Sequence, residues 1–262
     1  MMNFFRLAWA YFRVGALNEL QYRVNFFIQV FQSFLALGTG LVGLALVFNH
    51  TDSLSGWSRP ELLAVMGIHI LMGGLIKTTI QPNMERLMGD VQQGTLDYTL
   101  TRPADSQVLV SVREVRIWQV VDILMGLFVL LVALVQIQNR VGLWQALGFG
   151  IALFMGGLMI YCFWLMLTTG AFWVVRMDQI VELFQGVYLA GRWPVGIYPP
   201  WLRAGLTFLV PVAFAVTVPA EALTGRLTWQ TMLGAAALTA FLLVLARWVW
   251  KTGLRNYTGA SA

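Results

Sequence analysis

The chain has 262 residues, of which 58% are hydrophobic and only 11% are charged, whereas an ordinary soluble domain carries about 25% charged residues. A mean hydropathy of +0.71 argues against a water-soluble domain and indicates a chain that folds in lipid. The formal net charge is +5, but the basic residues are scattered between apolar runs. This excludes a nucleic-acid-binding patch and points to membrane topology instead.

Residues 1–24 alternate aromatic side chains with spaced charges. Arg6 and Arg13 lie seven positions apart, and therefore on one face of a helix, with Trp9 and Tyr11 between them. This pattern predicts an interfacial helix that lies in the headgroup plane of a membrane. The alternative is that these residues form a frayed start of the first membrane span.

Apolar runs of bilayer length follow, and each span needs roughly 20 apolar residues. They predict an all-α integral membrane protein that forms a single transmembrane domain over residues 1–262, with six transmembrane helices. The predicted spans cover about 25–48, 62–76, 118–137, 143–169, the segment from Asp178 to about Tyr188, and 229–250.

The stretch 190–226, before the last predicted span, is punctuated by prolines. Each proline removes a backbone donor and clashes with the preceding helical turn, so one uninterrupted span is not expected there. Non-helical backbone survives at membrane depth only where protein or a water-filled cavity covers it. We therefore expect short re-entrant helices that dip into the outer leaflet and return. The prolines are Pro194, Pro199, Pro200, Pro211 and Pro219.

The distribution of Lys and Arg predicts the orientation of the chain. Six spans put both termini on one side, and the side with more basic loop residues faces the cytoplasm. Twelve of the 17 basic residues fall in the segments that share the side of the termini. We therefore expect a multi-pass protein of the inner (plasma) membrane with cytoplasmic termini. Those segments are 1–24, 77–117, 170–178 and 247–262.

Residues 81–117 form a sustained polar stretch on the predicted cytoplasmic side. Within it, Gly94 permits a turn, and Leu96 and Leu100 have the i, i+4 spacing of an apolar helix edge. Pro103 ends the helix that these residues predict. A short amphipathic helix of this kind suits docking into the groove of a partner protein.

Known nucleotide motifs do not fit this chain. Gly38, Gly40 and Gly43 spell G-x-G-x-x-G, but they lie inside an apolar run rather than in the βαβ unit that a dinucleotide site requires. Small residues that let membrane helices approach closely are the better interpretation. No G-x-x-x-x-G-K-[ST] sequence is present, so the chain carries no nucleotide cofactor and any ATP use requires a partner.

Catalytic and metal-binding residues are also scarce. The two histidines, His50 and His69, have no neighbouring Cys or paired carboxylate, so no metal site is expected. A membrane-embedded lipid-modifying enzyme remains an alternative, through His50 and Asp52, and so does a membrane scaffold. The intramembrane groups Asp122, Glu182 and His69 fit either structural pairing or substrate and proton handling.

The run Gly94-x-Leu96-Asp97-x-x-Leu100-x-Arg102-Pro103 resembles the cytoplasmic signature of permeases in the type-2 ABC exporter family, in its small single-domain prokaryotic branch. Further similarity lies in three places and covers the chain in order. These are Tyr198-Pro199, Pro211-x-Ala213-Phe214 with Pro219, and the tail Gly253-Leu254-Arg255-Asn256-Tyr257-x-Gly259.

The resemblance implies a permease that is not itself an enzyme and that pairs with a second permease, the same chain or a paralogue. A separate P-loop ABC ATPase dimer would carry ATP and Mg and drive export of an amphiphilic, lipid-like or drug-like substrate by alternating access. It implies a pathway along the second and fifth spans through Met72, Phe184 and Tyr188. The implied ATPase-coupling residues are Gly94, Leu96, Asp97, Leu100, Arg102 and Pro103.

Overall fold

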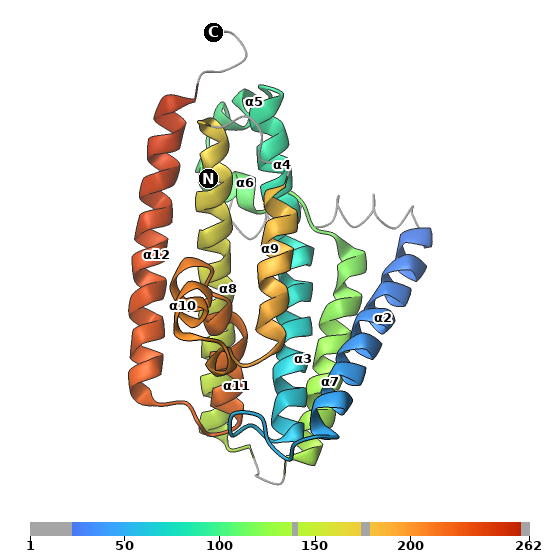
Figure 1. Ribbon diagram of the computed structural model, residues 1–262. Helices are drawn as coiled ribbons and strands as arrows, with labels where there is room; N and C mark the ends of the chain where they lie inside the picture. The colour runs from blue at the N-terminus through green and yellow to red at the C-terminus, as the bar shows by residue number, and fades with distance from the viewer. Residues whose placement is uncertain (1–22, 138–140, 174–178, 258–262) are drawn as a thin grey trace.

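The computed structural model describes residues 23–137, 141–173 and 179–257, which form a bundle of helices (Figure 1). No strand occurs within these ranges, so the predicted all-α class is confirmed. The predicted interfacial helix lies outside the described residues, apart from positions 23 and 24, which begin α2. Five helical stretches are long and apolar enough to cross a membrane, namely Val24–Phe48, Arg59–Gln92, Ile117–Gln136, Leu143–Phe172 and Trp229–Asn256.

In Figure 1, α5 and the end of α12 lie at the top, which we call the α5 end, and the loop between α2 and α3 lies at the opposite end. The described helices, in chain order, are α2 (Arg23–Phe48), α3 (Arg59–Leu75), the π-helix η1 (Ile76–Ile80), α4 (Gln81–Gln92), α5 (Asp97–Leu100), α6 (Ser106–Ser111), η2 (Ile117–Gln119), α7 (Val120–Gln136), α8 (Leu143–Thr169), η3 (Gly170–Phe172), α9 (Ile180–Leu189), η4 (Ala190–Arg192), η5 (Val195–Ile197), α10 (Pro200–Ala204), the π-helices η6 (Gly205–Leu209) and η7 (Ala213–Thr217), α11 (Val218–Leu223) and α12 (Trp229–Asn256).

The second span is much longer than the sequence predicts. The predicted end is Ile76, but the helix continues through η1 and α4 as one stretch, Arg59–Gln92. Pro82 lies in the first turn of α4, and the π-helical turns of η1 precede it. The proline cannot donate the hydrogen bond that residue 82 of a regular α-helix would make to the backbone oxygen of Thr78, and the altered pattern of η1 accommodates this loss. The polar residues of α4 belong to the helix rather than to a loop.

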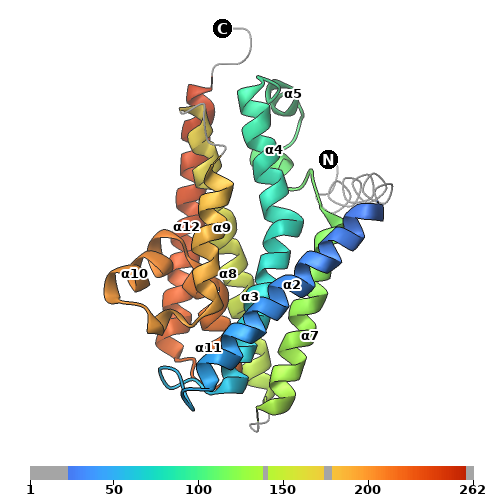
Figure 2. The same ribbon diagram turned by 45° about the vertical axis from the view of Figure 1, so that its right-hand side comes forward.

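The helices α3 and α7 pack at very short range because glycines face each other. A Cβ atom built on Gly126 would lie 2.3 Å from the backbone N of Leu71, and one on Gly67 would lie 2.8 Å from the backbone N of Leu130. Small residues of this kind drive helix association in lipid. The sequence predicts this role for Gly38, Gly40 and Gly43 of α2. A Cβ atom on Gly40 would lie against the Met66 side chain, but one on Gly38 or Gly43 would meet no described atom within 4 Å. These observations make α3 the centre of the bundle, with α2 inclined across it and α7 (Figure 2).

The predicted fifth span is helical over nearly all of its described residues, but it is too short to cross a bilayer. The helix α9 covers Ile180–Leu189, which is roughly 15 Å long and half of a bilayer's hydrocarbon thickness. Short helices follow, and the pair Pro200–Leu209 and Ala213–Leu223 is bent by 79° at Pro211. The prolines account for the breaks, as the sequence predicts. The count of six continuous spans is therefore not confirmed, since the described residues contain five, or six if the bent pair is one span.

The substitution Gly126→Ala tests the α3–α7 packing. Because the added methyl group meets backbone atoms that a side-chain rotation cannot move away, we expect a loss of about 2 kcal/mol of stability. The measurement is the thermal unfolding midpoint of the purified chain in detergent. Gly157→Ala on α8 is the control, since nothing lies within 4 Å of its Cβ position, and it should hold or raise the midpoint. Equal midpoints for both variants would contradict this account of the packing.

Candidate functional site

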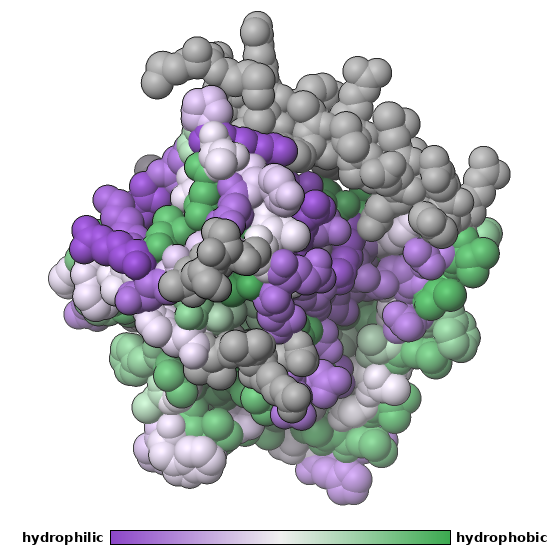
Figure 3. Space-filling view, turned by 90° about the horizontal axis from the view of Figure 1, so that it is seen from above, coloured by the Kyte–Doolittle hydropathy of each residue, from purple (hydrophilic) through white to green (hydrophobic). Residues whose placement is uncertain are grey.

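The polar residues of the chain gather at the α5 end, where hydrophilic surface is prominent in the end-on view (Figure 3). After α4 ends at Gln92, Gly94 adopts a positive φ of 69° that an L side chain rarely takes, and the chain turns into α5. Asp105 caps the start of α6, and its carboxylate accepts hydrogen bonds from the backbone N–H groups of Gln107 and Val108. We call residues 93–112 the α5 foot.

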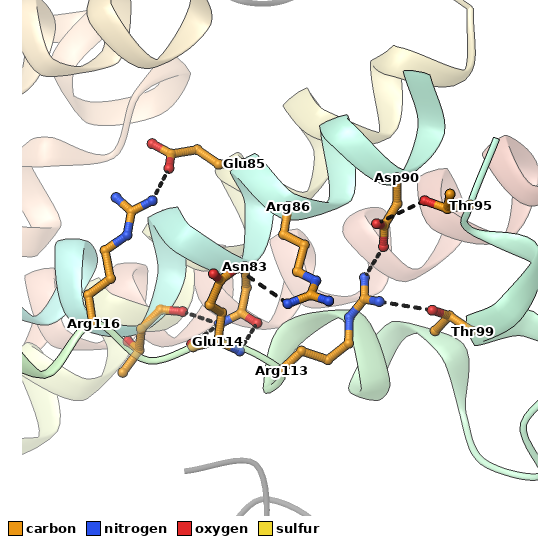
Figure 4. Close-up of polar contacts among 10 residues, drawn as sticks. Asn83, Glu85, Arg86, Asp90, Thr95, Thr99, Arg113, Glu114 and Arg116 are labelled. Atoms are coloured by element: carbon orange, nitrogen blue, oxygen red, sulfur yellow. Dashed lines mark hydrogen bonds and ion pairs between the residues drawn. The ribbon is translucent and has the colours of Figure 1, made fainter. Parts of the chain in front are cut away.

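A set of hydrogen bonds joins α4 to residues 114–116, which follow the α5 foot in the chain (Figure 4). The Asn83 side chain donates to the backbone oxygen of Glu114 at 2.7 Å and accepts from its backbone N–H at 2.9 Å. Arg116 donates to the Glu85 carboxylate at 2.5 Å. Asn83 is buried, so these bonds satisfy an amide that would be costly if left unpaired. The returning chain is therefore fixed along the side of α4.

A second contact, centred on Arg113, ties the α5 foot itself to α4. The Arg113 guanidinium donates to the Asp90 carboxylate at 2.6 Å and to the Thr99 hydroxyl at 2.9 Å. The Thr95 hydroxyl donates to the other oxygen of the Asp90 carboxylate at 3.2 Å. The side chains of Arg113 and Asp90 are only 10% and 17% exposed, so the pair is well shielded from water. Figure 4 shows Arg113 reaching between α4 and α5.

A third contact joins the α5 foot to α12. Arg247 donates to both oxygens of the Asp105 carboxylate, and to the amide oxygen of Gln107 at 2.8 Å. These hydrogen bonds from Arg247 hold the pKa of the Asp105 carboxyl below its ordinary value, so the carboxyl stays ionised at neutral pH. The α5 foot is thus attached to two long helices, α4 and α12.

The structure separates the predicted coupling residues into buried and exposed groups. Leu96 is fully buried, and Leu100 packs against the core, whereas Arg102 and Pro103 are exposed. The sequence analysis did not single out Tyr98, which is 76% exposed at the tip of the foot. The ion pair between Asp90 and Arg113 was not predicted from the sequence either. Only their opposite charges within one polar stretch could have signalled the pairing.

The predicted pathway residues lie around α9, but they do not all face one cavity. Phe184 and Tyr188 are buried, and their rings stack with centroids 5.7 Å apart. Tyr188 also stacks on His69 at 4.5 Å and donates its hydroxyl to the backbone oxygen of that residue at 2.8 Å. Met72 is fully buried and lines a separate apolar groove with Tyr161.

Asp122 has the structural partners that one of the two sequence interpretations foresees. Its carboxylate lies 3.2 Å from the Lys77 ammonium and accepts hydrogen bonds from Gln29, at 3.1 Å, and from Ser33. Lys77 therefore forms an ion pair within the span rather than marking its end. Glu182 is exposed on the outer face of α9 and lines a shallow pocket with Gln179.

Within the described part of the chain, no three His, Cys, Asp or Glu side chains gather in a way that would hold a metal ion. The single cysteine, Cys162, is buried in α8. The polar groups found instead are ion pairs between helices, together with one cavity of about 190 Å³ beside Tyr188 and His69. Such an arrangement suits the transmission of movement and the binding of small groups.

The described residues thus form a multi-helix membrane domain with an attached polar foot. A family model described as "ABC-2 family transporter protein" matches residues 34–261 of the chain. No curated protein and no solved structure matches significantly. The chain belongs to the ABC-2 family of transporter proteins and is a multi-pass membrane permease. Permeases of this family normally work with an ABC ATPase.

The substitution Arg113→Ala tests the contact between the α5 foot and α4. It leaves the shielded Asp90 carboxylate without its partner, so we expect the foot to lose about 3 kcal/mol of local stability. The measurement is the rate of limited chymotryptic cleavage after Tyr98, at the tip of the foot, in the detergent-purified chain. That rate should rise at least tenfold, because cleavage follows the population of the opened foot.

Arg86→Ala is the matched control for this measurement. Arg86 lies 4.0 Å from the Glu114 carboxylate, and both side chains are about half exposed, so the pair contributes little. Chymotryptic cleavage after Tyr98 should remain close to that of the unmodified chain. If both variants are cleaved at the same rate, Arg113 does not hold the foot.

Proposed function

We propose that the chain is the membrane-spanning subunit of an ATP-driven exporter, coupled to its ATPase through the α5 foot. A separate P-loop ATPase dimer carries ATP and Mg, and the permease pairs with itself or with a paralogue. The complex moves an amphiphilic, lipid-like or drug-like substrate out of the cytoplasm by alternating access. Family membership supports this proposal, and one structural observation supports the mechanism in particular.

That observation is the rigid connection between the α5 foot and the core of the bundle. Asp90 and Arg113 attach the foot to the end of a helix that runs unbroken from Gln92 back to Arg59. A force on the foot therefore acts on a helical rod roughly 50 Å long, and this rod includes Lys77 and His69. Closure of two ATPases beneath the foot would tilt this rod and change the exposure of the pathway.

The exposed tip of the foot provides the surface for the ATPase. Tyr98 is a large aromatic side chain, and Asp97 and Arg102 beside it offer charges of both signs. Aromatic and arginine side chains dominate the binding energy of protein interfaces. Leu96, which is buried, serves instead to anchor the foot in the core.

The proposed orientation places the α5 end in the cytoplasm of a cell with the protein in its inner (plasma) membrane. The excess of Lys and Arg near that end supports this orientation. A Cys162→Ala chain that carries either Tyr98→Cys or Ser53→Cys tests it with a membrane-impermeant maleimide. Position 53 should react in intact cells, and position 98 only after the membrane is opened. Reaction of position 98 in intact cells would overturn the orientation and the coupling proposal together.

The double variant Asp97→Ala, Arg102→Ala tests coupling in the purified complex of permease and ATPase. We expect ATP-dependent transport to fall at least tenfold, with weaker co-purification of the ATPase, because the charges at its docking surface are lost. The double variant Asp52→Ala, Arg59→Ala, which removes the same two charge types at the opposite end, should leave both measurements unchanged. Full ATPase binding and full transport by the first variant would remove the α5 foot from the mechanism.

A further inference from the structure

The small cavity beside Tyr188 collects charged and polar side chains from several helices, and the coupling mechanism does not use them. Its volume is about 190 Å³, which is less than the roughly 300–1,000 Å³ of a site for a drug-sized ligand. It can hold the head group of a larger molecule. The polar side chains that line it are Ser33, His69, Lys77, Asp122, Gln185, Tyr188 and Arg192.

The cavity lies deep in the membrane domain. His69 is roughly 15 Å along the helix from its start at Arg59, which is half of the roughly 30 Å hydrocarbon thickness. The ideal Cβ position of Gly191 lies 3.5 Å from His69 Nδ1, so Arg192 enters the cavity at the same depth. A charge at that depth is expensive, and it is retained where it has a function.

The charges of the cavity do not balance. The Asp122 carboxylate already accepts from Lys77, Gln29 and Ser33. Among the described residues, the Arg192 guanidinium has no hydrogen-bond acceptor or ion-pair partner. With neutral His69, the lining carries two positive charges and one negative charge. One positive charge is left without compensation.

A second polar group also lacks a partner. His69 is buried, and its Nδ1 atom has no hydrogen-bond partner in the part of the chain that the structure describes. Unpaired buried polar atoms are rare because each one costs desolvation energy. The ring is held in place by Tyr188, which stacks on one face and donates to the backbone oxygen of His69. His69 and Arg192 therefore present a fixed nitrogen and a cation to the same small space.

We propose that this cavity binds the anionic head group of an amphiphile, either a phosphate or a carboxylate. The fork of the Arg192 guanidinium suits the paired oxygens of such a group, and the Lys77 ammonium and the His69 ring nitrogen complete the set of donors. The inference rests on the proposed function, since it names the substrate class that the permease carries.

The surroundings of the cavity favour an amphiphile over a free inorganic anion. Met66, Ile70 and Leu189 form its apolar rim, and Leu189 is 54% exposed on the surface of the bundle. An alkyl chain attached to the bound head group can stay in the hydrocarbon beside this surface, which is favoured over water by about 0.8 kcal/mol for each CH₂ group. A free anion gains nothing there.

Binding of radiolabelled dodecyl phosphate to the full chain in phosphatidylcholine nanodiscs tests the proposal. We expect saturable binding that dodecanoate displaces and dodecyltrimethylammonium does not. Inorganic phosphate should compete only at far higher concentration, because it lacks the chain. Displacement by inorganic phosphate at equal concentration would overturn the amphiphile assignment, and displacement by the cationic probe would overturn the anion site itself.

Two variants and a control connect the binding to Arg192. Arg192→Gln should weaken dodecyl phosphate binding at least tenfold. Arg203→Gln should leave it unchanged, because Arg203 donates to the backbone oxygen of Gly196 and does not line the cavity. Gln185→Arg adds a cation to the lining and should tighten binding several-fold, which tests the site even if Arg192→Gln does not fold. Unchanged binding in Gln185→Arg, or in a folded Arg192→Gln, would contradict the proposal.

Co-purification of the ATPase separates this proposal from the proposed function. If dodecyl phosphate does not bind while the ATPase still co-purifies with the chain, the anion site is wrong and the permease mechanism stands. If the probe binds in the predicted manner but no P-loop ATPase accompanies the chain, the site stands and the coupling mechanism is wrong.

Discussion

In hydrocarbon, every backbone N–H and C=O group must find its partner within the protein, and this constraint governs the helix from Arg59 to Gln92. The helix remains continuous across Pro82 because η1 adjusts its hydrogen-bonding pattern just before the proline. Several other features of the bundle depend on this rod. It packs against α7, carries the cavity residues His69 and Lys77, and holds the α5 foot at its end.

Lipid supplies little hydrophobic drive between helices, so close packing and polar contacts hold the bundle together. Gly67 and Gly126 allow α3 and α7 to approach until their backbones nearly touch. Asp122 then links α7 to Lys77, and through Gln29 and Ser33 it links α7 to α2. The Asp122 side chain is only 10% exposed, so loss of Lys77 would leave a carboxylate with little water to replace its partner. The same argument explains why Asp90 and Arg113 can carry force.

Hydropathy alone predicted most of the fold. The predicted fourth span, 143–169, coincides with α8 (Leu143–Thr169), and the first span starts within two residues of α2 (Arg23–Phe48). The end of the second span was missed because Gln81 and Asn83 read as loop residues by composition. In the structure both side chains are buried and bonded, Gln81 to Glu85 and Asn83 to the backbone of Glu114. The Asn83 pairing joins residues that are 31 positions apart, and a linear pattern does not reveal it.

The candidate site was less predictable than the fold, for the same reason. The motif from Gly94 to Pro103 located the foot correctly as a turn and a short helix, but it emphasised Asp97 rather than the Asp90 and Arg113 contact. The sequence did not reveal the cavity, since its residues come from six elements, α2, α3, η1, α7, α9 and η4. The sequence predicts Arg192 as a cation in an outer loop, so it was not a candidate site residue. It lies at mid-depth of the membrane domain because α9 is short.

A rod that carries a ligand site at its middle and an ATPase contact at its end implies reciprocal coupling. If tilting the rod changes the distance between Lys77 on the rod and Arg192 on η4, a bound anion favours the arrangement in which both cations reach it. By linkage, the ATPase state that produces this arrangement must raise the affinity for the anion by the same factor. Export further requires that the opposite tilt separate the two cations, because a head group held equally in both states would never be released. The uncompensated Arg192 fits this requirement, since Lys77 keeps Asp122 as a partner when the anion leaves, and among the described residues no internal acceptor holds Arg192 in the arrangement seen here.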